Sequence, residues 1–113
     1  MTTTIQDKKT YYKAEGYVYG LLWGGGEGTY PSREIKSDNI DDLREQIMNG
    51  IKDGSLDSGM GYQRLIGSMM NITIITEVVI DGKVFKNYEY ETEFFGDLSE
   101  DQQEFLMCQM YEY

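Results

Sequence analysis

The sequence predicts a single compact α+β domain, in which an antiparallel sheet of about four strands carries two helices on one face. Three observations predict this class: two stretches with the alternation of strands, two segments with helical spacing and caps, and glycine-rich breaks where they join. The chain has 113 residues, which is room for one domain over residues 1–113, with residues 1–9 expected to be a flexible N-terminus. The expected order is strand, strand, helix, strand, strand, helix.

The first hairpin is expected within residues 10–36. Residues 10–23 are rich in tyrosine and read as a long strand, one face of which carries small residues such as Ala14 and Gly16. A helix can approach such a face closely. The glycine-rich run at residues 24–28 ends this strand, and residues 29–36 can return beside it.

Two segments carry the signals of helices. Residues 37–52 begin with a capping Asp38 or Asn39 and place an apolar stripe at helical spacing, made of Ile40, Leu43, Ile47 and Ile51. Ser99 and Gln102 have the spacing of a capping box, so a second helix is expected over residues 99–111. Both helices are expected to cover the same face of the sheet.

The second hairpin, in residues 66–95, depends on the geometry of its turn at Gly82. A two-residue turn would set Ile72 and Ile74 beside Glu91 and Glu89, whereas a turn with Gly82 as a left-handed bulge residue puts the apolar sets together. The sequence therefore predicts a type I turn through Ile80 and Asp81, followed by the Gly82 bulge. The glutamates then lie on the far face, opposite Ile72, Ile74, Tyr88 and Tyr90.

Composition excludes several classes of function. Twenty acidic residues stand against ten basic ones, so the net charge of −10 disfavours direct binding to nucleic acid or to anionic membranes. The chain has no histidine and one cysteine, Cys108, which removes the usual general base, disulfide frameworks and cysteine zinc sites. No catalytic residue, metal ligand or cofactor is expected, and the protein is not expected to be an enzyme. With no export signal and no apolar run of membrane-spanning length, the expected location is the cytoplasm.

The acidic C-terminal third is the strongest functional signal. No lysine or arginine follows Lys86, and strand geometry spaces Glu89, Glu91 and Glu93 about 7 Å apart, twice the rise per residue. This interval is comparable with that of phosphates along a nucleic-acid strand. One interpretation is a surface that occupies a cationic groove, and the other is a solvated face that maintains solubility. The candidate partner-binding residues are Glu89, Glu91, Glu93, Asp97, Glu100, Asp101 and Glu104.

The glycine-rich loop offers an alternative site. It lacks the Lys-Ser/Thr ending of a phosphate loop, and it leads into Tyr30-Pro31 instead of a helix. Its aromatic neighbours are residue types that anchor interfaces. The alternative partner-binding set is Trp23, Gly24, Gly25, Gly26, Glu27 and Tyr30, which in a small homo-oligomeric protein could enclose a small molecule.

The stretch Asp53-Gly54-Ser55-Leu56-Asp57-Ser58-Gly59-Met60-Gly61-Tyr62, with the size, acidity and lack of histidine, resembles small proteins of phages and conjugative elements from low-GC Gram-positive bacteria. Some proteins of that kind are anti-CRISPR inhibitors, and several of those act as nucleic-acid mimics on Cas nucleases. The resemblance implies a non-enzymatic inhibitor that binds a host defence or nucleic-acid-binding protein, a Cas nuclease being one such target. The expected partner is a host protein with a cationic nucleic-acid-binding groove. A homodimer, a ligand-binding protein and a structural or regulatory mobile-element protein stay open as alternatives.

Overall fold

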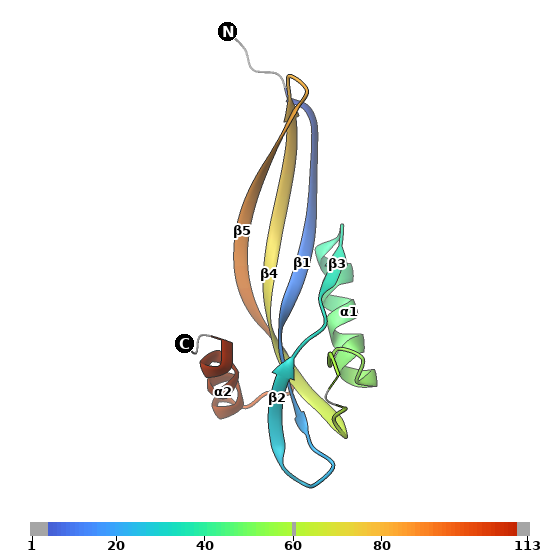
Figure 1. Cartoon of the computed structure of the whole chain (residues 1–113), viewed down its shortest axis with the longest axis vertical. Coiled ribbons are helices and arrows are strands. Elements are labelled where there is room, and N and C mark those ends of the chain that lie inside the picture. The colour runs from blue at the N-terminus through green and yellow to red at the C-terminus, as the bar shows by residue number, and fades with distance from the viewer. Residues whose placement is uncertain (1–4, 60, 111–113) are drawn as a thin grey trace.

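The computed structural model describes residues 5–59 and 61–110 and is an α+β protein built on one antiparallel sheet (Figure 1). This confirms the predicted class. The sheet has five strands, in the order β2-β1-β4-β5, with the short β3 pairing with β1 on the same edge as β2. The elements are β1 (Ile5–Leu21), β2 (Glu27–Pro31), β3 (Ile35–Ser37), α1 (Ile40–Asp53), β4 (Arg64–Ile80), β5 (Lys83–Gly96) and α2 (Glu100–Met110).

Strand β1 begins earlier than the sequence predicts. Residues 5–9 were expected to be flexible, but they pair with the far end of β4, Lys8 opposite Val78 and Lys9 opposite Glu77. The ammonium of Lys9 lies 3.5 Å from the carboxylate of Glu77, so opposite charges support this register. Residues 1–4 of the expected flexible segment lie outside the described residues.

The molecule is elongated instead of compact. Its extents are 65 × 29 × 21 Å, and its radius of gyration is 17.2 Å, against about 13 Å for a compact chain of this length. The reason is strand length, because β1 and β4 have 17 residues each and a strand of that length spans about 55 Å. Residues 5–11, 75–80 and 83–88 extend beyond both helices as a three-stranded projection, here called the β-arm (Figure 1).

The two helices pack on opposite faces of the sheet, so the prediction that both cover one face is wrong. Helix α1 covers the face that carries Ile72, and α2 covers the face that carries Tyr19. The cause lies in two apolar doublets, Met69-Met70 and Phe94-Phe95, whose neighbouring side chains point to opposite faces. Both faces of this part of the sheet are therefore apolar, and each needs its own helix.

The predicted helix signals are confirmed. The Asn39 side chain accepts hydrogen bonds from the backbone N–H groups of Asp41 and Asp42 at 2.8 and 3.1 Å, and Gly54 ends α1 in the left-handed conformation. At α2, Ser99 and Gln102 exchange hydrogen bonds as a capping box does, at 3.2 and 2.9 Å. The cap of α1 therefore falls at Asn39, one of the two residues predicted.

The turn between β4 and β5 differs from the prediction. Ile80 pairs with Lys83, and the two residues between them, Asp81 and Gly82, both have positive φ (53° and 76°), as in a type I′ turn. Gly82 is left-handed as predicted, but the expected bulge is absent. The prediction assumed that a buried face sets the register, whereas no helix in the described part of the chain covers either face of the β-arm. The local preference of Asp-Gly for a type I′ turn decides instead.

Candidate acidic interface

The two-residue turn moves the glutamates of β5 to the other face of the sheet. Ile74 pairs with Glu89, Ile72 with Glu91 and Met70 with Glu93, so these carboxylates share the face that α1 covers. The prediction that they lie opposite Ile72 and Ile74 is therefore wrong. Tyr88 and Tyr90 project from the other face, where they are exposed.

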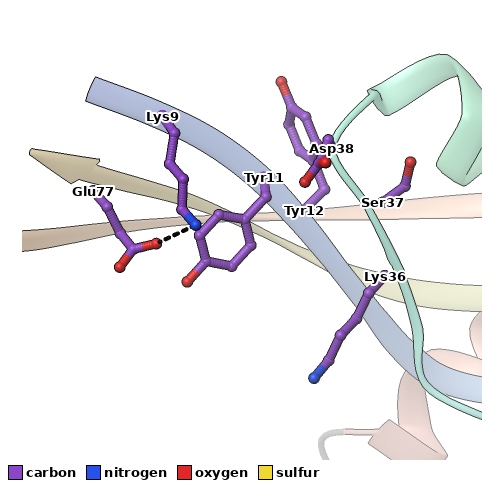
Figure 2. A pocket seen from close by; sticks show the side chains of 7 residues that line it. All are labelled: Lys9, Tyr11, Tyr12, Lys36, Ser37, Asp38 and Glu77. Carbon is purple, nitrogen blue, oxygen red and sulfur yellow. Dashed lines mark ion pairs between the residues drawn. The ribbon is translucent and has the colours of Figure 1, made fainter. Parts of the chain in front are cut away.

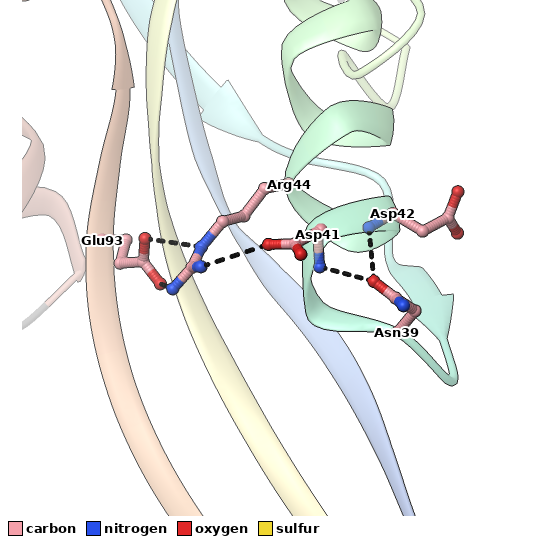
Figure 3. A network of polar contacts seen from close by, with 5 residues as sticks. All are labelled: Asn39, Asp41, Asp42, Arg44 and Glu93. Atoms are coloured by element: carbon pink, nitrogen blue, oxygen red, sulfur yellow. Dashed lines mark hydrogen bonds and ion pairs between the residues drawn. The ribbon is translucent and has the colours of Figure 1, made fainter.

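Glu93 is bound by a cation from α1. The guanidinium of Arg44 donates two hydrogen bonds to its carboxylate, from Nε at 3.1 Å and from Nη2 at 3.0 Å (Figure 3). The hydrogen bond to Glu93 raises the pKa of Arg44, and the charges of Glu93, Asp41 and Glu91 raise it further. Arg44 therefore connects α1 to the outer strand. Sequence reasoning missed this pair because 49 positions separate the two residues.

We call the carboxylates of Asp41, Glu89, Glu91 and Glu93 the acidic surface. The Arg44 guanidinium lies within 4.0 Å of the Glu93 and Asp41 carboxylates, and the charge of Glu91 also acts on it. Asp41, Glu89 and Glu91 are exposed, whereas Glu93 is half-buried. Glu89 and Glu91 are two positions apart on the same face of β5, which spaces them about 7 Å apart. Because a single arginine is bound among them, the acidic surface keeps a negative charge.

The other predicted acidic residues lie elsewhere. Glu100, Asp101 and Glu104 are exposed on α2, and Asp97 is exposed in the segment that precedes it. Because α2 packs against the opposite face of the sheet, the structure does not bring its three carboxylates together with Glu89 and Glu91. Asp97 instead lines a pocket with Ile51 and Lys52 of α1. The predicted acidic face is thus divided among separate surfaces.

The glycine-rich loop is a tight turn that exposes its aromatic residue. The Leu22 N–H donates to the Gly26 carbonyl at 2.7 Å, and the Trp23 side chain is 75% exposed, with its indole N–H donating to the Gly61 carbonyl at 2.9 Å. Tyr30 packs against the core beneath α1 instead, and Glu27 accepts a hydrogen bond from the Tyr19 hydroxyl. The candidate loop residues therefore do not converge on one shared site.

An open pocket of about 390 Å³ lies at the edge of β1, where β3 ends (Figure 2). Lys9 lies over the ring of Tyr11, 5.4 Å from its centroid, and is ion-paired with Glu77. Sequence reasoning missed this pocket because only strand pairing brings its parts together. Its lining residues are Lys9, Tyr11, Tyr12, Lys36, Ser37, Asp38 and Glu77.

The remaining chemical groups form no cluster. Within residues 5–59 and 61–110, no three Asp, Glu, Cys or His side chains are placed to hold a metal ion. Cys108 is exposed on α2, and in the same part of the chain no helix has the length and apolarity to cross a membrane. Comparisons of the sequence with protein-family models and curated proteins, and of the fold with solved structures, find no match.

Proposed function

We propose that the protein is a non-enzymatic inhibitor that binds a host defence or nucleic-acid-binding protein, a Cas nuclease being the first candidate. The observation that carries the proposal is the exposure of Glu89 and Glu91 on the outermost strand of the sheet, about 7 Å apart, with the exposed Asp41 carboxylate 4.0 Å from the arginine that binds Glu93. In the proposed complex these carboxylates occupy sites that a cationic groove otherwise offers to phosphates. The protein would act in the cytoplasm of the host cell.

Electrostatics favours this function over a purely solubilising role. Like charges at neighbouring positions on one face of a strand repel, and the structure uses its nearby arginine on Glu93 and not on Glu89. A surface that keeps uncompensated charge at a stability cost suits a partner of opposite charge. Such a partner would associate quickly and lose affinity as salt is raised.

The test measures DNA cleavage by a panel of purified, guide-loaded Cas nucleases in the presence of the protein. The acidic-surface variant combines Asp41→Asn with Glu89→Gln, which removes two charges and retains side-chain size. We expect it to need about tenfold more protein for half-inhibition, mainly through slower association, with a weaker dependence on salt. Incubating the nuclease with target DNA before the protein is added should protect the nuclease from inhibition, because the DNA then occupies the cationic groove.

The matched control combines Glu100→Gln with Glu104→Gln, which removes the same charge from α2 on the opposite face. This variant should inhibit like the parent, because only the charge at the acidic surface meets the partner. An equal loss of inhibition in both variants would show that inhibition depends only on the net charge of the protein. If the parent protein neither inhibited nor bound any of these nucleases, the proposed target would be rejected.

A further inference from the structure

Strand β5 presents an open edge. It pairs with β4 on one side, and in the described part of the chain no strand pairs with its other side. Because Ile80 and Lys83 flank a two-residue turn, they form a hydrogen-bonded pair, and the pairs alternate from there. The backbone N–H and C=O groups of Val84, Lys86, Tyr88 and Tyr90 therefore point away from β4. An edge of this kind is a template for another strand.

The charges along this edge are arranged so that it complements itself. Lys83 and Lys86 stand at the end near the turn, and Glu89 and Glu91 stand farther along the strand. An antiparallel second copy brings the cationic end of each strand to the acidic end of the other. The partner that fits the edge is therefore another copy of the same strand.

We propose that two copies of the protein pair through β5, antiparallel, about a two-fold axis at Asn87. Such an axis, perpendicular to the sheet, places the α1 faces of both copies on the same side of the joined sheet. On the α1 face Lys83 then lies opposite Glu91 of the second copy, and Phe85 opposite Glu89. On the other face Val84 lies opposite Tyr90, and Lys86 opposite Tyr88.

Other registers oppose like charges or leave charges without partners. An axis at Tyr90 sets Glu89 against Glu91, and an axis at Lys86 sets Lys86 against itself, both of which are destabilising. An axis at Tyr88 sets Lys83 against Glu93, which Arg44 already binds. The axis at Asn87 gives Lys83 an exposed carboxylate, Glu91. It sets each Lys86, which is ion-paired with Glu77 of its own chain at 3.8 Å, opposite the ring of Tyr88.

Pairing also covers apolar side chains that the single chain exposes. Val84 is 58% exposed, Tyr90 is 70% exposed, and Phe85 and Tyr88 are about half exposed. One strand edge buries less than the roughly 800 Å² per partner of a standard interface, so a weak dimer that depends on concentration is expected. The dimer does not rest on the proposed inhibition, but it sets Lys83 and Phe85 of the second copy opposite Glu91 and Glu89, so pairing lowers the negative charge that the acidic surface presents to another protein.

The decisive test uses charge reversal and sedimentation velocity over a hundredfold range of protein concentration. Lys83→Glu alone and Glu91→Lys alone should each weaken the dimer about tenfold, because each disrupts two symmetric contacts. The variant that carries both changes should dimerise like the parent. Eight residues of strand separate the two positions by about 27 Å, so rescue can only come from contact between chains. Monomer at every concentration, or double-variant affinity no better than the single variants, would overturn the proposal.

Cysteine cross-linking tests the register. In a Cys108→Ser background, Asn87→Cys places two thiols at a non-hydrogen-bonded pair on the axis, where Cα atoms about 4.5 Å apart permit a disulfide. We expect a covalent dimer under mild oxidation. Asn49→Cys, an exposed position on α1, is the matched control and should stay monomeric. Faster cross-linking through Tyr88→Cys would reject the Asn87 axis.

Discussion

Ile74 of β4 lies directly opposite Glu89 of β5, so an apolar side chain of the central strand and an exposed carboxylate share one face of the sheet. The next set of paired residues on this face shows the same contrast, since Ala14 and Ile72 are buried and Glu91 is exposed. Helix α1 covers β1 and β4 and contacts β5 through Arg44. The outer strand can therefore be acidic because it forms the rim of the apolar face.

The register that creates this rim depends on the turn at Gly82. Gly82→Ala should destabilise the protein by about 1 kcal/mol, because φ at this position is 76° and alanine adopts that conformation at a cost. Urea unfolding measures the change. Gly24→Ala is the control, since a Cβ there would contact nothing and its φ is not left-handed. If both substitutions destabilised the protein equally, the left-handed conformation of Gly82 would not be the cause.

The sequence predicted the fold class, both helices and their caps because these depend on short-range patterns. The Asn39 and Ser99 caps involve residues within three positions of each other, and helical spacing marks the stripe of α1. The register of β5 and the side of the sheet that α2 covers were predicted wrongly. Both predictions assumed one apolar face, whereas Met69-Met70 and Phe94-Phe95 place apolar side chains on both faces.

The candidate site could be predicted only as a set of exposed acidic residues. Periodicity identified Glu89 and Glu91 as neighbours on one face, because they lie on one strand. It could not identify the link from Glu93 through Arg44 to Asp41, since these residues approach one another only when α1 packs on the sheet. The sequence prediction also placed the acidic residues of α2 near the strand glutamates, although α2 packs against the opposite face of the sheet.

Ser68 provides a test of polar burial in the core. Its hydroxyl is fully buried and has no hydrogen-bond partner among the described residues. Ser68→Ala removes this unsatisfied group, so it should stabilise the protein by about 1 kcal/mol in urea or thermal unfolding.

A contrasting change is Ser32→Ala. The Ser32 hydroxyl accepts a hydrogen bond from the Gly16 N–H at 2.9 Å, so its loss should destabilise the protein. If Ser68→Ala also destabilised the protein, a partner such as buried water would have to satisfy its hydroxyl.

Tyr19 and Glu27 make stability depend on pH in the alkaline range. The hydrogen bond to Glu27, then burial and the Glu27 charge, raise the pKa of Tyr19 to about 12 from its ordinary value near 10. The unfolded chain therefore loses this proton first. The stabilisation is complete below pH 10 and disappears as the pH rises towards 12.

Glu27→Gln tests this link because it removes the charge and weakens the acceptor. The pKa of Tyr19 should fall, and the parent's advantage in unfolding free energy should narrow between pH 10 and 12. The tyrosinate absorbance and urea unfolding at each pH measure the two effects. Glu15→Gln, at an exposed position on β1, should leave both unchanged. A Tyr19 titration that is identical in the parent and Glu27→Gln would contradict the assignment.

The Arg44–Glu93 pair should couple α1 to the outer strand in a way that salt weakens. The side chains are 43% and 29% exposed, so water and ions screen the pair in part even though its two hydrogen bonds are well formed. Arg44→Met and Glu93→Gln should each lower the melting temperature, and the double variant should lower it by less than the sum of the two. The coupling between the mutations should shrink in molar salt. Additive effects of the two mutations at low salt would show that the pair contributes nothing to holding α1 against β5. The position of α1 on the sheet would then depend on the apolar contacts of Leu43 and Ile47 alone.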